Sequence, residues 1–286
     1  MTAFTTIRTV GAALPADVLA ATVGDAQLKG QYTQQKSVET RGIHMNHTVK
    51  PLDNLKVRQA IAKALDREAI VKTVFQEKYV PTTQWIPAGV PGIQQADVVE
   101  QKFDAAGAKQ ALTEAGFPNG QNFPRLKLLL RDNKEARDFG EFVKTDLKKN
   151  LNIDIDLEIV DAKTRSTRYN AGQFELFLGG WIQDFPDPEN WIDGLWNTGG
   201  GNNKPKFSNA ELDTLLKANK AELNNEKRLA AYRQMHDIIN KSVAIANVYH
   251  GAYNYLIKPK VGGVNVTLVD AMLPRDWNAE SWYMKK

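Results

Sequence analysis

The chain has 286 residues, of which 42% are hydrophobic and 24% charged, a balance typical of a globular protein with one large domain or two modest ones. Its formal net charge is +4, but Lys and Arg lie beside Asp and Glu along amphipathic segments, so we find no basic stripe and expect no nucleic-acid partner. The absence of cysteine excludes disulfides, thiol catalysis and cysteine-based zinc sites, and no apolar run approaches the ~20 residues of a membrane-spanning helix.

The first fifty residues carry few structural signals. Residues 12–30 indicate a short helix, and residues 40–48 indicate a strand with apolar residues on one face. His44 and His47 lie three residues apart, which places them on opposite faces of a strand. We therefore expect ordinary surface or hydrogen-bonded histidines there, and no metal site.

Two amphipathic helices are predicted after residue 50. Asp53 or Asn54 can cap the first, because a side-chain oxygen there accepts a backbone N–H of the first turn, and apolar residues then recur every three or four positions. Asp66 can cap the second. A loop rich in Pro and Gly follows over residues 81–92 and contains Trp85, and loops of this length in compact domains are often functional.

Residues 103–178 alternate between helical and strand periodicity. The clearest strand signal is at residues 153–159, where isoleucine and leucine alternate with acids. A βαβαβ order of this kind predicts an α/β sheet with parallel pairings. The expected elements are a helix over 103–115 closed by Gly116, a strand over 126–131, a helix over 135–150, the strand over 153–159, a helix over 163–171 and a strand starting at Phe174.

Two more helices and two strands complete the expected elements. Ser208 opens a capping box at the start of one helix, and Asn224 or Asn225 starts the next. Strands are expected over 243–249 and 253–257, followed by a tail over 261–286 whose scattered aromatic residues should pack against an apolar surface.

Residues 174–203 hold the strongest functional signal. The strand from Phe174 is expected to break at Gly179-Gly180 and to expose Trp181 in a loop that carries several acids. Loops at the carboxyl ends of strands carry the ligand-binding groups of α/β proteins. We therefore interpret this loop as one wall of a binding cleft.

The acids Asp184, Asp187 and Glu189 admit several interpretations. A calcium loop is disfavoured because their spacing fits no EF-hand, and a glycoside hydrolase needs a second carboxylate across the cleft, which the sequence does not reveal. In a recognition site, an Asp in a loop lined by Trp181 and Trp191 would pair with a ligand ammonium while the indoles contact apolar groups. The alternative without a ligand is that Trp181 belongs to the core and the acids cap the next helix.

Four stretches of the sequence form a recognisable combination: residues 55–75, 103–120, 174–191 and 207–239. In that order they closely resemble the extracellular solute-binding proteins of peptide and nickel ABC importers, of the dipeptide- and oligopeptide-binding type, over roughly residues 40–258. The resemblance implies an α/β fold of the periplasmic-binding-protein type II, with mixed sheets flanked by helices in two lobes that close over the ligand. It also implies that residues 1–50 are a remnant of the first lobe with the hinge crossing, residues 51–258 the second lobe, and residues 259–286 a tail returning to the first lobe.

The resemblance also assigns roles to residues. In peptide-binding members, the acid three residues after a Gly-Trp pair holds the terminal ammonium of the peptide. Here the pair is Gly180-Trp181 and the acid is Asp184, so Asp184 is the first candidate and Trp181 the second, with Gly180 and Asn202 as further ligand-binding candidates. No enzymatic activity, catalytic residue, cofactor or protein-bound metal is implied, and with so few histidines a nickel ligand would need an organic chelator.

The implied function is that of the substrate-binding component of an ABC importer, which captures peptides or related small solutes and delivers them to membrane subunits. Members are periplasmic or extracellular, and membrane-anchored in Gram-positive-type cells. They are considerably longer and begin with a signal sequence that this chain does not show, so we expect a C-terminal fragment that self-associates through the surface facing the first lobe. The alternatives are a ligand-sensing or interaction protein without transport and a carboxylate-dependent hydrolase.

Overall fold

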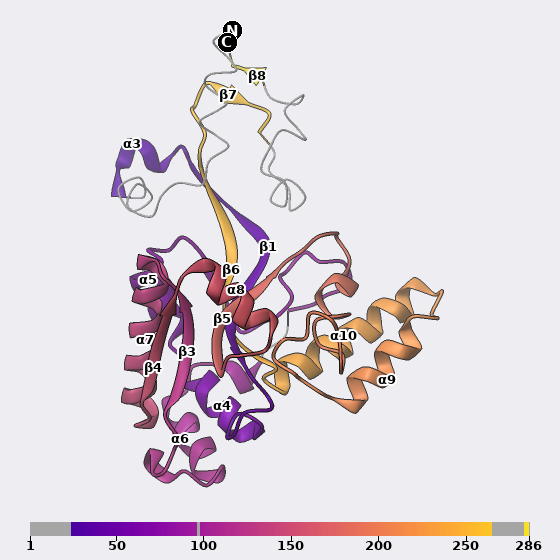
Figure 1. Cartoon of the computed structure of the whole chain (residues 1–286). Coiled ribbons are helices and arrows are strands. Elements are labelled where there is room, and N and C mark those ends of the chain that lie inside the picture. The colour runs from indigo at the N-terminus through magenta and orange to yellow at the C-terminus, as the bar shows by residue number, and fades with distance from the viewer. Residues whose placement is uncertain (1–23, 96–97, 265–282, 286) are drawn as a thin grey trace.

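A six-stranded mixed sheet forms the centre of the molecule (Figure 1). The computed structural model describes residues 24–95, 98–264 and 283–285. In the order β2-β6-β1-β5-β3-β4, the last three strands are parallel, and the remaining pairings, including that of β1 with β5, are antiparallel. The strands are β1 (Tyr32–Met45), β2 (Val80–Pro81), β3 (Leu126–Arg131), β4 (Ile155–Val160), β5 (Leu176–Ile182) and β6 (Ile245–Leu256).

The parallel half of the sheet confirms the predicted βαβαβ order. α7 (Lys134–Leu151) connects β3 to β4, and α8 (Ala162–Asn170) connects β4 to β5. Successive side chains of a strand point to opposite faces, so Leu128 packs in the main core with α7 whereas Leu129 packs near Tyr169 of α8. This double coverage explains why the leucine run of β3 is buried on both faces.

Side-chain caps fix where the helices begin. Asn54, one of the two predicted candidates, caps α4, and Asp66 caps α5 as predicted. The cap of α9 is Asn209 and not the predicted Ser208, because the Asn209 side chain accepts the Leu212 N–H at 2.9 Å. Asn and Ser cap helices about equally well, so two such neighbours leave the start of a helix undecided in the sequence. The helices are α4 (Leu55–Ala64), α5 (Arg67–Thr73), α6 (Ala105–Glu114), α9 (Ala210–Asn219) and α10 (Asn225–Lys241), with short 3-10 turns η1 (Val99–Gln101), η2 (Pro118–Gly120) and η3 (Pro188–Trp191).

β5 continues through the glycine pair at which the sequence predicts a break. The strand ends only at Ile182, because β1 pairs with it over its whole length. Glu39 of β1 lies opposite Ile182, and Met45 lies opposite Leu176. A Cβ on Gly180 would lie 1.8 Å from the carbonyl oxygen of Thr40. The glycine is therefore required by the close approach of two strands and not by a turn.

Two other strands are longer than predicted. β1 starts at Tyr32 instead of residue 40, and β6 is one strand where the sequence predicts two. β1 and β6 pair with each other along most of their lengths. Figure 1 shows them leaving the sheet together toward the small sheet formed by β7 (Val261–Gly262) and β8 (Tyr283–Met284).

Two predictions fall largely outside the described residues. Of the helix expected over residues 12–30, the structure shows only α3 (Ala26–Lys29). Of the tail expected over 261–286, it describes residues 261–264 and 283–285. No helix in the described ranges combines the length and the apolar character that crossing a bilayer requires.

A second core contains three buried tryptophans. Trp85, Trp191 and Trp196 are almost completely buried, and Trp85 packs edge-on against both of the others, with ring centroids 5.5 and 5.0 Å apart. The Nε1–H of Trp85 donates to the carbonyl oxygen of Trp191 at 2.7 Å. Leu212 of α9 and Met235 of α10 belong to the same cluster. The Pro- and Gly-rich loop that was predicted to be functional is thus tied into the core through Trp85.

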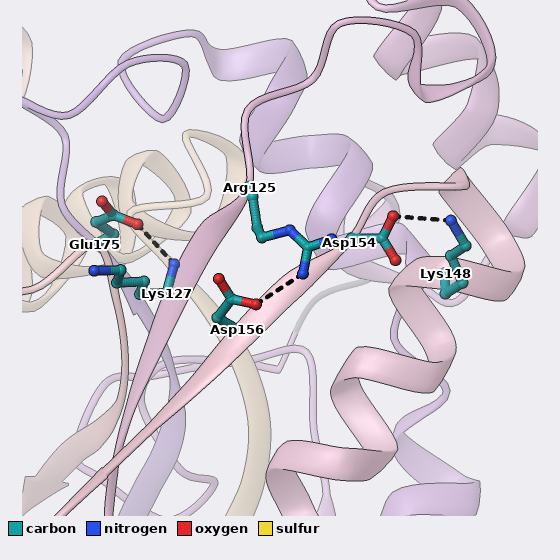
Figure 2. A network of polar contacts seen from close by, with 6 residues as sticks. All are labelled: Arg125, Lys127, Lys148, Asp154, Asp156 and Glu175. Carbon is teal, nitrogen blue, oxygen red and sulfur yellow. Dashed lines mark hydrogen bonds and ion pairs between the residues drawn. The ribbon is translucent and has the colours of Figure 1, made fainter.

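Charged side chains form a network at the amino ends of β3 and β4 (Figure 2). The ion pairs are exposed, so water and salt screen them and they add little stability. The network lies at the opposite end of the parallel strands from their carboxyl ends, which remain open for a site. Arg125 pairs with Asp156 at 2.9 Å, Lys148 pairs with Asp154 at 2.9 Å, and the carboxylate of Glu175 accepts the backbone N–H of Lys127 at 2.6 Å.

Gly180→Ala should destabilise the protein by about 1–3 kcal/mol or more, because the added methyl group must push β1 away from β5. Urea unfolding followed by circular dichroism measures this loss. Gly201→Ala is the matched control, because a Cβ at Gly201 meets no atom within 4 Å. Equal stability of the two variants would show that the strands separate without cost, contrary to this account.

Candidate functional site

Trp181 and Asp184 lie at the carboxyl end of β5, and both are held by the side chain of Asn190. The Nε1–H of Trp181 donates to Oδ1 of Asn190 at 2.9 Å, and the backbone N–H of Asp184 donates to the same oxygen at 2.9 Å. The amide of Asn190 in turn donates to the Asp184 carboxylate at 3.3 Å. Sequence reasoning did not single out Asn190, whose only signal is its place within the stretch 174–191.

Asp184 and Asp187 have different environments. Asp184 is exposed, and no cation in the described part of the chain pairs with its carboxylate. Asp187 caps η3 through the Glu189 N–H at 2.9 Å and forms a two-pronged ion pair with Arg228 of α10. Burial is the largest single influence on the pKa of Asp187 and raises it, but the hydrogen bonds from Arg228 and from the Glu189 N–H, together with the charge of Arg228, outweigh burial and hold the pKa below its usual value. The capping role considered for the acids therefore applies to Asp187, and Asp184 is open to a ligand.

Three of the four predicted ligand-binding residues surround one cavity of about 200 Å³, here called the tryptophan cavity. They are Gly180, Trp181 and Asn202, whereas Asp184 does not belong to its wall. The remaining wall is rich in aromatic rings. It is formed by His44, Trp85, Tyr169, Asn170, Leu195, Trp196, Lys204 and Pro205.

Trp191 is not available to a ligand, contrary to the expectation that it lines the site beside Trp181. Its side chain is completely buried, and its Nε1–H donates to Oε1 of Gln183 at 2.8 Å. Trp181, in contrast, is half-buried. Trp181 lies near the end of β5 and Trp191 in η3 ten residues later, and their packing distinguishes the core residue from the site residue.

A second hollow, of about 250 Å³, lies where the carboxyl end of β3 meets the amino end of α7, and is here called the arginine hollow. Arg41, Arg131 and Arg165 line it. Arg131 and Arg165 have no carboxylate partner within the described segments, so the hollow is positively charged, and the amino end of α7 adds to this charge. Its two acids are already paired, Glu39 with Arg41 at 2.5 Å and Glu135 with Lys78 at 3.5 Å.

Two contacts hold Arg165 in the wall of the arginine hollow. Its guanidinium lies 4.1 Å from the centre of the Phe177 ring and donates to the carbonyl oxygen of Leu178. Its buried Nε has no partner among the residues that the structure describes. Burial lowers the pKa of Arg165, and repulsion from Arg41 and Arg131 lowers it further. A carboxylate bound here would relieve this repulsion.

Both hollows adjoin the pairing of β1 with β5. Arg41, in the wall of the arginine hollow, is the register partner of Gly180, in the wall of the tryptophan cavity. No sequence pattern points to the arginine cluster, because its members come from three distant segments of the chain. The structure thus adds a cationic region to a site for which the sequence predicts Asp184, Trp181, Gly180 and Asn202.

The four histidines are neutral near pH 7, because burial lowers the pKa of each to about 3. His44, expected to be an ordinary histidine, lines the tryptophan cavity. Within the described ranges, no group of three or more His, Asp or Glu side chains could hold a metal ion.

The sheet and its hollows define an α/β fold with candidate ligand sites at the carboxyl ends of strands, where such sheets place their ligands. A sequence model of the bacterial extracellular solute-binding proteins, family 5, matches residues 9–203. The chain belongs to this family, which confirms the resemblance found in the sequence.

Known relatives agree with this assignment. The oligopeptide-binding protein OppA of Bacillus subtilis is 28% identical over 211 residues, which are 71% of this chain and 38% of that protein. Heme-binding protein A of Haemophilus influenzae is 29% identical over 241 residues, which are 82% of this chain and 43% of that protein. The crystal structure of a periplasmic oligopeptide-binding protein from Borrelia burgdorferi matches with a TM-score of 0.76 at 28% identity, over 95% of this chain and 52% of that one.

Two facts follow from these matches. The fold is that of the periplasmic binding proteins of type II, with a mixed sheet flanked by helices, as the sequence predicts. The chain spans about half the length of these relatives or less. What the relatives bind therefore bears on this chain only as a basis for a proposal.

Asp187→Asn should reduce the pH dependence of stability. The pKa of Asp187 is lower in the folded than in the unfolded state, so its ion pair contributes stability above the unfolded-state pKa and loses it as the pH falls through the folded-state pKa. We expect the variant to lose about 1 kcal/mol of unfolding free energy at pH 7, allowing for solvent screening, and less at pH 3. Urea unfolding at both pH values measures the difference.

Asp138→Asn is the control for this measurement, because Asp138 forms an exposed pair with Lys134. It should change the unfolding free energy little at either pH. A loss for Asp187→Asn that is the same at pH 7 and pH 3 would contradict the assigned ion pair.

Proposed function

We propose that this chain is the ligand-capturing lobe of the substrate-binding component of an ABC importer, and that its ligand is a peptide or a related small solute with a free ammonium group. Membership in a family of extracellular solute-binding proteins supports the general role. Relatives named for oligopeptides and dipeptides support the ligand class. Because another relative is named for heme, the argument for a peptide rests on the site itself.

The observation that carries the proposal is the exposed carboxylate of Asp184 beside Trp181. Asn190 holds both residues, so the carboxylate is already oriented when the ligand arrives. A ligand ammonium would form a charge-assisted hydrogen bond with it. The exposed side chains of Ile182 and Phe185, together with the Trp181 ring, would contact apolar parts of the same ligand.

The arginine hollow carries positive charge, opposite to the negative charge of Asp184. Glu39 in its wall is the register partner of Ile182, the last residue of β5, so the hollow adjoins the strand end from which the Asp184 loop leaves. In this proposal the ligand ammonium meets Asp184 while its carboxylate faces Arg131 and Arg165. Recognition of the charged ends of a peptide leaves the choice of its side chains loose.

The organisation of the whole protein is part of the proposal. Residues 51–258 form the second lobe, residues 1–50 and 259–286 belong to the first lobe and the hinge crossing, and β1 and β6 carry the chain between them. Closure of two lobes over a bound solute is a common way for such proteins to capture a ligand. The protein would act in the periplasm or outside the cell and deliver its ligand to the membrane subunits of an importer.

A carboxylate-dependent hydrolase receives less support from the site than a binding protein does. Asp187, the nearest second acid after Asp184, is held by Arg228 and by a backbone N–H of η3, so it is not free to act as a base or a nucleophile. The proposed function is therefore non-enzymatic. A sensing role without transport has no specific observation in its favour.

Asp184→Asn should raise the Kd for trialanine about tenfold or more, because a hydrogen bond between charged groups is worth roughly 1.5–3 kcal/mol. N-acetyl-trialanine, which lacks the ammonium, should bind the unchanged protein as weakly. Isothermal titration calorimetry measures both, with Asp138→Asn as the matched control. Equal affinity of the acetylated and free peptides would overturn the role of Asp184, and peptide cleavage that Asp184→Asn abolishes would favour the hydrolase.

Self-association is expected at the same surface. Ile182 and Phe185 each leave 45% of their area exposed at the end of β5, and exposed apolar side chains of this kind favour association. Sedimentation velocity should show concentration-dependent association that the double variant Ile182→Ser and Phe185→Ser reduces. Leu223→Ser, at a residue that is 98% exposed, should leave the association unchanged. A monomer at all concentrations would contradict this expectation.

A further inference from the structure

Glu39 and Arg41 form an ion pair within the wall of the arginine hollow. They lie two residues apart on β1, so both side chains point to the same face of the sheet. Nε of Arg41 donates to Oε1 of Glu39 at 2.5 Å. The side chain of Arg41 is 31% exposed and that of Glu39 is 20% exposed, so a ligand in the hollow can reach both.

The neighbouring strand β6 leaves space for the Glu39 carboxylate. A Cβ on Gly251 would lie 2.8 Å from Oε2 of Glu39, closer than Cβ atoms approach other atoms in folded proteins. Oε1 meets Arg41 and Oε2 lies against a residue without a side chain, so the fold sets the position of the carboxylate. Burial raises the pKa of Tyr249 in the same wall, and the nearby Tyr79 and Glu39 raise it further. The charge of Glu39 therefore acts inside the hollow.

Two positive charges of the described wall remain for a ligand. Glu39 neutralises the charge of Arg41, whereas Arg131 and Arg165 have no carboxylate partner among the residues that the structure describes. In the proposed function, one carboxylate of the ligand faces both of these arginines. A second carboxylate would then find no unpaired cation in the described wall and would approach the two acids of the hollow, Glu39 and Glu135.

We infer that Glu39 is a specificity-determining residue, which pairs with Arg41 and so limits the arginine hollow to ligands that bring a single carboxylate to it. A peptide that ends in Asp or Glu brings two carboxylates, so it binds more weakly than a peptide that ends in an uncharged residue of the same shape. Repulsion between like charges in a partly buried site supplies this discrimination. The inference rests on the proposed function, because it requires that the terminal carboxylate of the ligand enters the hollow.

Two tripeptides that differ by one charge test the inference. Isothermal titration calorimetry at low ionic strength compares Ala-Ala-Glu, the Glu peptide, with Ala-Ala-Gln, the Gln peptide, which has nearly the same shape. The unchanged protein should bind the Glu peptide about fivefold or more weakly, because its side-chain carboxylate approaches Glu39. The difference should shrink in about 1 M salt, which screens charges beyond roughly 3 Å. Equal affinity, or tighter binding of the Glu peptide at low salt, would overturn the inference.

Variants of the ion pair locate the discrimination at Glu39. Glu39→Gln removes the negative charge and releases Arg41, so both peptides should bind more tightly, and the Glu peptide should gain about tenfold more than the Gln peptide. Adding Arg41→Met to this variant should abolish the extra gain. Glu141→Gln, at an exposed position of α7 outside the described wall, is the matched control and should leave both Kd values unchanged. A gain that is equal for the two peptides, or an extra gain that survives Arg41→Met, would contradict the role of Glu39.

The inference and the proposed function fail with different results. If trialanine does not bind, or binds no more tightly than its C-terminal amide, the ligand carboxylate does not use the hollow, and the proposed function fails in this part together with the inference. If trialanine binds more tightly than its amide while the Glu and Gln peptides bind equally, only the role of Glu39 fails. The comparison of peptides on the unchanged protein keeps the test decisive even if Glu39→Gln prevents folding.

Discussion

The close contact between β1 and β5 is the constraint on which the candidate site depends. Because Gly180 has no side chain, the carbonyl oxygen of Thr40 occupies the space that a Cβ would need, and β1 can pair with the end of β5. The same pairing brings Arg41 to the arginine hollow and His44 to the tryptophan cavity. A shift of one residue in this register would turn every side chain of β1 to the other face of the sheet and dismantle both hollows.

The exposed part of the site lies on a loop that is anchored to the rest of the fold. The loop after β5 is anchored in the core by Trp191 and tied to α10 by the ion pair between Asp187 and Arg228. Asn190 lies between these two anchors and holds Trp181 and Asp184 by hydrogen bonds. The loop is therefore ordered by folding, and a ligand need not order it again. The end of β5 and the loop after it therefore contain anchoring residues and exposed residues of the same type: Asp187 and Trp191 anchor the loop, whereas Asp184 and Trp181 remain accessible.

Elements with local signals could be predicted from the sequence. The cap at Asp66, the helix α7 and the strand β4 depend on patterns within a few residues, and the structure confirms them. The passage of β5 through Gly180 could not be predicted, because its cause is the backbone of Thr40, far away in sequence.

The same reasoning applies to the site. The Gly-Trp pair and the acid after it point to Trp181 and Asp184, but composition alone could not show that Trp191 is core. The arginine hollow draws Arg41, Arg131 and Arg165 from separate segments, and only the folded chain brings them together. The roles of Asp184, Trp181, Gly180 and Asn202 in ligand binding and the division of the chain into lobes stay predictions.

The pairing of β1 with β6 is interrupted between Lys36 and Thr40 and again just after Arg41. A two-stranded ribbon bends most easily where its ladder of hydrogen bonds is irregular. Glu39 lies within the first interruption and is paired with Arg41 at the second, so the irregular part of β1 carries two charges of the arginine hollow. Both residues lie where β1 is also paired with β5, so these irregularities of the strand help to shape the wall of the arginine hollow.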